Sequence, residues 1–341
     1  MSESIPLSLS DVHALASATL RANGLSDEQT QALADTVTAA ERDGCKSHGL
    51  FRIPAYVQSA RNGLANPVAV PSIHDLAPGV VQVDAQNGFA PLALSMGREP
   101  LIAKTTSQGI AALGIINSCH IAALWPEVEA LAERGLVAFA FVTAASYVAP
   151  AGGTKPLFGT NPMAFAWPRP DGKPPLVFDQ ASSASARGEI MLHQRDGKPL
   201  PEGWAIDADG QPTTDPAAAL AGAQLPFGGY KGAAIALMVE LLAGALIGGP
   251  FSFEVSQMDK KDGSLPPRGE FIIAIDPGRC VSADNKTAQL AHAEALFSRM
   301  LEQPGTRLPA DRRYQMRQIT PTEGITIPRA LFEQIKNLQQ V

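Results

Sequence analysis

Cysteine is scarce in this chain of 341 residues, which contains only Cys45, Cys119 and Cys280. Three cysteines are too few for a disulfide framework, and an odd, small number is typical of a reducing compartment. The N-terminus also lacks the pattern of a signal peptide, a basic segment followed by an apolar core and a small-residue cleavage site. We therefore expect a cytoplasmic protein.

Long hydrophobic runs are missing as well. The most apolar stretch, residues 233–249, is interrupted by Glu240 and is shorter than the ~20 residues that a membrane-spanning helix needs. It predicts a buried helix of a globular protein, so a membrane is not an expected partner.

Charged side chains are few, at 18% of the residues against about a quarter in an average globular protein. Hydrophobic residues make up 45%, which argues against a disordered chain and favours a well-buried enzyme or oligomer subunit. The 27 Lys and Arg against 33 Asp and Glu give a net charge of -6, with no basic block that could follow a phosphate backbone. Nucleic acid is therefore not an expected partner.

Several motifs of ligand chemistry are absent. No G-x-G-x-x-G follows a predicted strand and no G-x-x-x-x-G-K-[ST] occurs, so neither a Rossmann site nor a P-loop is expected. The histidines show neither H-E-x-x-H nor a Cys/His pair at ligand spacing, and we expect no metal site. The nearest phosphate-binding pattern is GGYKG at 228–232, where backbone N–H groups and Lys231 could hold a phosphate. A glycine turn with a solvated lysine explains the same residues.

The length exceeds what one compact core fills, so we expect two domains or one large composite domain. In the tail from residue 307 we expect a proline-bounded loop, then the short run GITIP, and a final helix from Arg329. Alternating strands and helices would by themselves favour a parallel, doubly wound sheet. Helices are predicted in the N-terminal quarter and at 91–107, 121–133, 230–247 and 284–303, and strands at 79–85, 109–117, 136–143, 163–167, 176–179 and 271–276.

Two polar clusters carry chemistry. Ser47, His48 and Arg52 precede a helix that Pro54 opens, and the run NSCH at 117–120 follows a strand. An arginine fork binds a carboxylate through two charge-assisted hydrogen bonds, and histidine can donate or remove a proton near neutral pH. The first cluster therefore suits a small carboxylate substrate, although a histidine before a helix, taken alone, is more often a structural residue.

Five segments together resemble a known family. SHGLFRIPAY (47–56), NSCHIAALWP (117–126), PLFGTNPMAF (156–165), PFGGYKG (226–232) and RLPADRR (307–313) have the order and spacing found in the malate/L-lactate dehydrogenase family that lacks a Rossmann fold. Within it, the runs HIAALWPEVE and GGPFSFE resemble the branch of delta-1-piperideine-2-carboxylate/delta-1-pyrroline-2-carboxylate reductases. The resemblance spans nearly the whole chain.

The resemblance implies roles for particular residues. His48 would be the proton donor, with Ser47 and an acidic residue completing a relay. Glu189 stands at the acidic position, where close relatives carry aspartate, and Arg52 and Thr160 would bind the substrate. The implied cofactor contacts are His120, Ile121, Ala122, Ala123, Leu124, Phe178, Asp179, Gln180, Tyr230, Lys231, Arg307, Arg312 and Arg313.

The implied fold is an α/β arrangement like that of L-sulfolactate/malate dehydrogenases, with a largely antiparallel central sheet and helical parts at both ends. Residues 1–77 would form the N-terminal helical part and residues 78–304 the cofactor-binding and substrate-lining core. Residues 305–341 would pack back on the N-terminal part, and the protein would be a homodimer.

The implied activity is the NADPH-dependent reduction of cyclic imino acids to L-proline or L-pipecolate. Arg312 and Arg313 favour NADPH over NADH because arginine suits a 2'-phosphate, while paired arginines in a tail are more often a solvated surface. The same His-Arg pair would also serve a keto acid, so a 2-hydroxy-acid dehydrogenase is the alternative. A binding protein without turnover is a third reading, against which the joint presence of His48, Arg52 and Lys231 argues.

Overall fold

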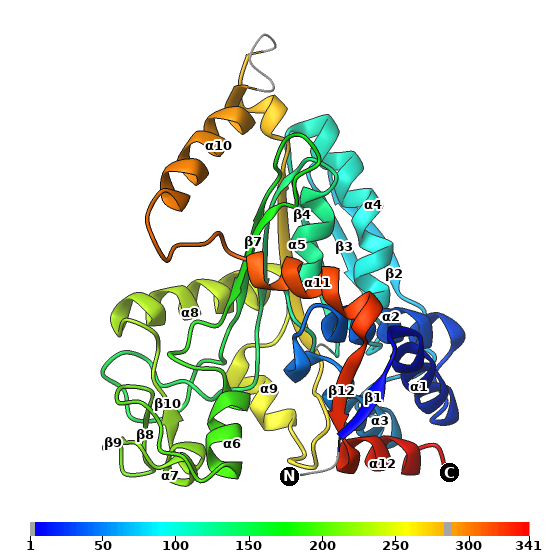
Figure 1. The fold of residues 1–341 in the computed structure, drawn as a ribbon, viewed down its shortest axis with the longest axis vertical. Coiled ribbons are helices and arrows are strands. Elements are labelled where there is room, and N and C mark those ends of the chain that lie inside the picture. The colour runs from blue at the N-terminus through cyan, green and yellow to red at the C-terminus, as the bar shows by residue number, and fades with distance from the viewer. Residues whose placement is uncertain (1–3, 120, 283–287, 341) are drawn as a thin grey trace.

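The computed structural model describes residues 4–119, 121–282 and 288–340 (Figure 1). Its α-helices are α1 (Leu9–Ala22), α2 (Asp27–Arg42), α3 (Ile53–Arg61), α4 (Ala90–Gln108), α5 (Trp125–Ala132), α6 (Arg187–Arg195), α7 (Pro216–Ala221), α8 (Tyr230–Ala243), α9 (Ser252–Met258), α10 (Ala288–Leu301), α11 (Asp311–Glu323) and α12 (Arg329–Asn337). Its 3-10 helices are η1 (Lys46–His48), η2 (Leu50–Arg52), η3 (Ala245–Ile247) and η4 (Pro277–Arg279).

A seven-stranded sheet forms the centre of the molecule (Figure 1). In spatial order its strands are β2 (Ser72–Ala77), β3 (Val80–Asp84), β4 (Ile110–Ser118), β11 (Arg268–Ile275), β5 (Val137–Val142), β6 (Met163–Trp167) and β7 (Leu176–Gln180). Neighbouring strands are antiparallel except for β3 and β4. The largely antiparallel sheet is thus confirmed. The parallel, doubly wound alternative is wrong because β11, late in the chain, inserts antiparallel between β4 and β5.

Helices cover both faces of this sheet. Leu94 of α4 and Leu131 of α5 pack in one core cluster with Ile272 of β11, whereas Val239 of α8 packs with Phe271. Successive residues of a strand point to opposite faces, so α8 lies across the sheet from α4 and α5. A central strand buried on both faces is apolar at consecutive positions, which explains the run FIIAI.

The two ends of the chain lie together. β1 (Ser4–Leu7) pairs antiparallel with β12 (Ile325–Pro328), and α12 packs against α1 and α3 (Figure 1). Ser8 begins α1 with a capping box to Asp11, and Ser26 caps α2 by accepting the Gln29 N–H. The domain boundaries at residues 77 and 304 stay a prediction.

A smaller unit lies between β7 and α8. Its three short strands, in the order β10-β8-β9, are β8 (Ala205–Ile206), β9 (Pro212–Thr213) and β10 (Ala223–Gln224), with α6 and α7 beside them. Figure 1 shows this unit below the central sheet, next to α9.

The predicted tail loop and the helix predicted over 121–133 differ from the structure. The helix α11 lies where a proline-bounded loop was expected. The sequence does not predict it because DRRYQMRQITPTE has no clear apolar stripe. Polar contacts instead hold the helix to the rest of the protein. The helix predicted over 121–133 begins only at Trp125, since Pro126 fits a first helical turn and leaves residues 121–124 in a loop.

The apolar stretch around α8 is not the buried helix that its sequence predicts. Residues Tyr230–Ile247 are long and apolar enough to cross a membrane by length and composition alone, but only 39% of this window is buried. Leu237, Leu241 and Leu246 are 48%, 50% and 62% exposed. One face of α8 packs on the sheet, and the opposite face presents apolar side chains outward.

Candidate active site

Ser47 and His48 lie in η1, the short turn that follows α2. The Ser47 hydroxyl lies 3.0 Å from His48 Nδ1, so the serine can orient the imidazole ring. The turn is held from beneath by Glu41 of α2, whose carboxylate accepts the Leu50 N–H at 2.8 Å. A Cβ atom at Gly49 would collide with this carboxylate, so glycine leaves room for the contact. Burial raises the pKa of Glu41.

Arg52 ends η2, immediately before α3. Its Nε–H donates to the Ser47 carbonyl at 2.6 Å, which ties the guanidinium to the turn that carries His48. Arg52 is half-buried, and this burial lowers the pKa of its guanidinium. Since Nε is occupied, the terminal nitrogens are the donors with which this side chain can meet a carboxylate.

Asp179 joins two of the segments implied in cofactor binding. Its carboxylate, at the end of β7, accepts the N–H groups of Leu124 and Trp125 at 2.8 and 3.0 Å. These groups begin α5, where a negative charge is stabilised by the helix dipole. Desolvation nevertheless raises the pKa of the buried carboxyl. Asp179 therefore fixes the loop 121–124 against β7.

The segment around Thr160 lies beside the chain that leaves β7. The Thr160 carbonyl accepts the Ser182 N–H at 2.7 Å, and the next residue, Asn161, is fully buried. The Asn161 amide donates to Glu240 of α8 at 2.7 Å. Phe227 donates its N–H to the Ser182 carbonyl at 3.0 Å, which brings the GGYKG segment to the same place.

The start of α8 is a glycine turn without a side-chain cap. Gly228 and Gly229 have φ of +57° and +64°, a backbone region that favours glycine, and a Cβ at either residue would meet open space. Gly229 gives no side-chain cap to α8, and Tyr230 and Lys231 are exposed. The Gly229 and Gly232 N–H groups donate to the Pro226 and Phe227 carbonyls at 3.3 and 3.0 Å, so an anion at this helix start would meet the N–H groups of Tyr230 and Lys231.

The remaining predicted residues fall in different surroundings. Arg313 is not a solvated tail residue, because its guanidinium stacks over Trp125 at 4.4 Å and donates to the Val177 carbonyl at 3.3 Å. Arg307 and Arg312 are exposed. The other cofactor positions are Ile121, Ala122 and Ala123 in the loop before α5, Phe178 and Gln180 on β7, and His120, which lies outside the described residues.

Glu189 lies exposed in the first turn of α6. Its assignment to the relay stays a prediction. Cys119 is fully buried, and burial raises the pKa of its thiol to about 12, so it has little thiolate character at neutral pH. The role of His48 as proton donor also stays a prediction.

The described residues show no group of three or more His, Cys, Asp or Glu that could hold a metal ion. The sequence profile of a known family, described as malate/L-lactate dehydrogenase, matches residues 7–336 of this chain. The chain belongs to the malate/L-lactate dehydrogenase family. The family resemblance read from the five motifs is thus confirmed.

Relatives within the malate/L-lactate dehydrogenase family are similar over their full length. A delta(1)-pyrroline-2-carboxylate reductase of Ancylobacter novellus is 50% identical over 99% of this chain and 98% of its own. A delta(1)-pyrroline-2-carboxylate/delta(1)-piperideine-2-carboxylate reductase of Pseudomonas aeruginosa is 50% identical over 97% and 98%. The crystal structure of delta1-piperideine-2-carboxylate reductase from Pseudomonas syringae pv. tomato superposes with a TM-score of 0.92 at 42% identity, covering 98% and 99% of the two chains.

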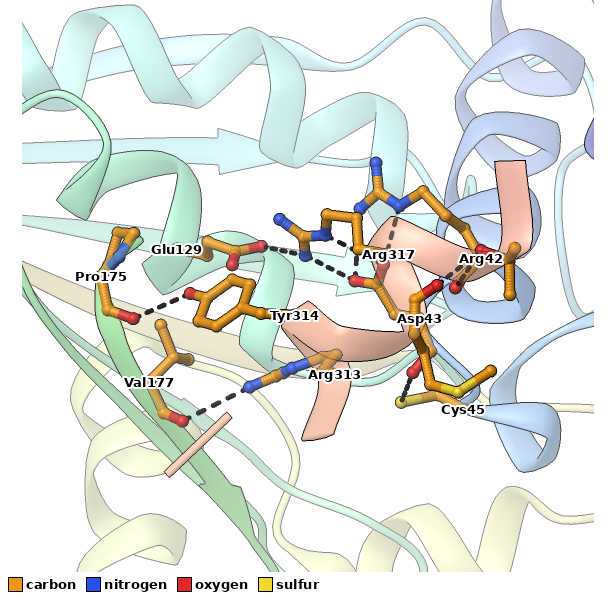
Figure 2. A network of polar contacts seen from close by, with 11 residues as sticks. Arg42, Asp43, Cys45, Glu129, Pro175, Val177, Arg313, Tyr314 and Arg317 are labelled. Carbon is orange, nitrogen blue, oxygen red and sulfur yellow. Dashed lines mark hydrogen bonds and ion pairs between the residues drawn. The ribbon is translucent and has the colours of Figure 1, made fainter. Parts of the chain in front are cut away.

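The sequence does not predict one group of residues that lies beside the candidate active site. Asp43, Glu129 and Arg317 form a buried ion-pair network between α2, α5 and α11 (Figure 2). The partners are separated by up to 274 residues, and no local pattern links them. The candidate site residues in the five motifs were predicted because the family resemblance includes those motifs.

Proposed function

We propose that this chain reduces the C=N bond of delta-1-pyrroline-2-carboxylate and delta-1-piperideine-2-carboxylate to give L-proline and L-pipecolate. The observation that carries this proposal is the 50% identity, over nearly the whole of both chains, to reductases named for these two substrates. The arrangement of Ser47, His48 and Arg52 supports it, because the substrates combine a carboxylate with a nitrogen that must be protonated.

The mechanism follows from the charge of the substrate. An imine protonated on nitrogen accepts hydride far better than a neutral imine, because hydride addition then discharges a cation. We assign to His48, oriented by Ser47, the task of keeping or delivering this proton. The terminal nitrogens of Arg52 hold the carboxylate, so that the ring is fixed at near-attack distance. Glu189 is the proposed acidic member of the relay, and Thr160 the second substrate contact.

Family membership implies a nicotinamide cofactor, and we propose NADPH, with NADH as the alternative. The bound cofactor supplies the hydride. The uncapped start of α8 with Lys231 fits a phosphate of this cofactor, and the exposed Arg312 suits a 2'-phosphate. The loop 121–124 and residues 178–180, joined through Asp179, are the proposed walls of the nicotinamide end.

The test of the proposed function follows NADPH absorbance with four substrates in parallel: pyrroline-2-carboxylate, piperideine-2-carboxylate, pyruvate and oxaloacetate. We expect turnover of the two cyclic imines, and the same panel with NADH measures the cofactor preference. Turnover of the keto acids alone would establish the 2-hydroxy-acid dehydrogenase instead. Absence of turnover with all four would favour a binding protein.

Replacing Lys231 by alanine should weaken NADPH binding. A charge-assisted hydrogen bond contributes ~1.5 to 3 kcal/mol, so the loss should raise the cofactor Kd roughly tenfold or more. Titration calorimetry measures this Kd. The control is Lys336→Ala, which changes a lysine on a different helix, α12. An unchanged Kd for Lys231→Ala would restore the interpretation of a solvated lysine.

We also propose that the protein is a cytoplasmic homodimer. Its three cysteines are unpaired thiols, which fits a reducing compartment.

The exposed apolar face of α8 and η3, with Leu237, Leu241 and Leu246, supports association with a second copy, because such a face in water is unfavourable.

Introducing a charge on this face should separate the two copies. We expect Leu241→Glu to halve the molar mass measured by light scattering, since burying an unpaired carboxylate in an interface is strongly unfavourable. Val68→Glu, at an exposed apolar position away from α8, should leave the mass unchanged. A mass for Leu241→Glu equal to that of the wild type would refute the assignment of α8 to the interface.

A further inference from the structure

We propose that α11 clamps together the segments that build the active site, with Arg317 as the positioning residue of this clamp. Arg317 donates from Nε to one oxygen of Asp43 at 3.0 Å and from one terminal nitrogen to the other at 2.5 Å (Figure 2). The same terminal nitrogen meets Glu129 at 2.9 Å. One guanidinium therefore binds two carboxylates, one at the end of α2 and one on α5.

The network is shielded from water, which makes its geometry well defined. The side chains of Asp43 and Glu129 are 0% and 6% exposed, and that of Arg317 is 20% exposed. Arg42 adds a second bidentate contact to Asp43, at 2.7 and 3.2 Å. Two arginines thus face two carboxylates, with the Arg42 side chain 32% exposed. Planar, bidentate arginine contacts of this kind fix direction as well as distance.

The first clamped segment leads directly to His48. Asp43 is followed by Gly44 and Cys45, and η1, which carries Ser47 and His48, begins at Lys46. Here α11 packs closely on the chain, because a Cβ on Gly44 would stand only 3.2 Å from the Met316 side chain. Thr320 of α11 donates its hydroxyl to the Arg42 carbonyl at 2.7 Å. The end of α2, and with it the start of the proton-donor turn, is therefore held by three successive contacts from one helix.

The second and third clamped segments are those assigned to the cofactor. Trp125, which directly follows the loop 121–124, lies under the guanidinium groups of Arg313 and Arg317 at 4.4 and 5.6 Å. Arg313 also donates to the Val177 carbonyl, and the Tyr314 hydroxyl donates to the Pro175 carbonyl at 2.8 Å (Figure 2). These two carbonyls lie on the chain just before residues 178–180.

The clamp sets the relative placement of the proton donor and the cofactor walls. The two walls are already joined to each other through Asp179, but the contacts of α11 link them to the turn that carries His48. Hydride transfer depends steeply on the distance between reacting groups, since a misplacement of about 1 Å can cost on the order of 100-fold in rate. Loosening the clamp should therefore act on the chemical step.

The test compares Arg317→Met and Arg317→Lys with the wild-type enzyme. We expect Arg317→Met to lower kcat at least ~10-fold, with the substrate KM and the NADPH Kd within about threefold. The kinetic isotope effect with NADPH deuterated at the transferred position should rise, because hydride transfer becomes more rate-limiting. Arg317→Lys should recover part of kcat, since it keeps the charge but loses the fork.

Arg169→Met is the matched control. Arg169 makes a bidentate contact with Glu294, at 2.7 and 2.8 Å, with side chains 16% and 17% exposed, but it ties α10 to the loop between β6 and β7. It should lower the melting temperature without changing kcat or the isotope effect. If Arg317→Met behaves in the same way, Arg317 is only structural and the proposal fails.

A second variant keeps the test decisive if Arg317→Met does not fold. Glu129→Gln removes one charge of the network and leaves the Asp43 pair in place, so it should lower kcat in the same direction by a smaller factor. Normal kcat and isotope effect in both Glu129→Gln and Arg317→Lys would overturn the proposal. The inference rests on the proposed function, because the roles of His48 and of the cofactor walls are part of it. Turnover by the wild-type enzyme in the four-compound panel tests that function separately, and the variants are compared on whichever substrate the wild type reduces.

Discussion

The His48→Ala variant should lose at least ~100-fold in kcat, the usual scale for a positioned acid or base, while its NADPH affinity stays near that of the wild type. The physical reason is the need to keep a proton on the imine nitrogen during hydride addition. The Ser47 hydroxyl lies 3.0 Å from Nδ1 of the ring, so the serine holds the orientation of the imidazole. Steady-state kinetics and calorimetric titration with NADPH measure the two quantities.

His292→Ala is the control for this change, because His292 is exposed on α10. It should leave kcat and cofactor affinity unchanged. A His48→Ala variant that loses cofactor binding but retains kcat would show that His48 belongs to the cofactor site, and the proton donor would have to be sought elsewhere. Ser47→Ala should lie between wild type and His48→Ala, since it removes only the orienting hydroxyl.

Replacing Arg52 should have the second largest effect on kcat/KM. Arg52→Ala should lose at least about tenfold in kcat/KM, because a hydrogen bond to a charged group contributes ~1.5 to 3 kcal/mol. Arg52→Lys keeps the charge but loses the fork, and it also loses the Nε–H that donates to the Ser47 carbonyl. The substrate KM should therefore rise in the order wild type, Lys, Ala.

Thermal melting separates this role from a structural one. Arg61→Ala is the control, since Arg61 lies on the neighbouring α3 and its Nε–H donates to Asn23 at 2.7 Å. It should leave the kinetics of cyclic imine reduction unchanged. If Arg52→Ala lowers the melting temperature while the folded enzyme keeps a normal KM, the arginine stabilises the η2 turn and the carboxylate is bound by another group.

Local sequence patterns predicted most of the regular elements. The apolar runs at 109–117, 136–143 and 163–167 correspond to β4, β5 and β6, and Pro54 lies in the first turn of α3. These signals work because alternation, capping and proline geometry act within a few residues of one another. The sheet order has no such signal, because the pairing of β11 with β4 and β5 joins segments far apart in the chain.

The sequence by itself determined the family, the strands, and the motifs around His48, Thr160 and Lys231, since each is a continuous run of residues. Only the tertiary structure decided that Asp179 caps α5 and that α8 presents an apolar face outward. It alone also placed Arg317 on Asp43 and Glu129, across separations of 274 and 188 residues. The physical reason is that an ion pair between distant segments depends on the packing of whole elements, whereas a helix start or a strand depends on its immediate neighbours.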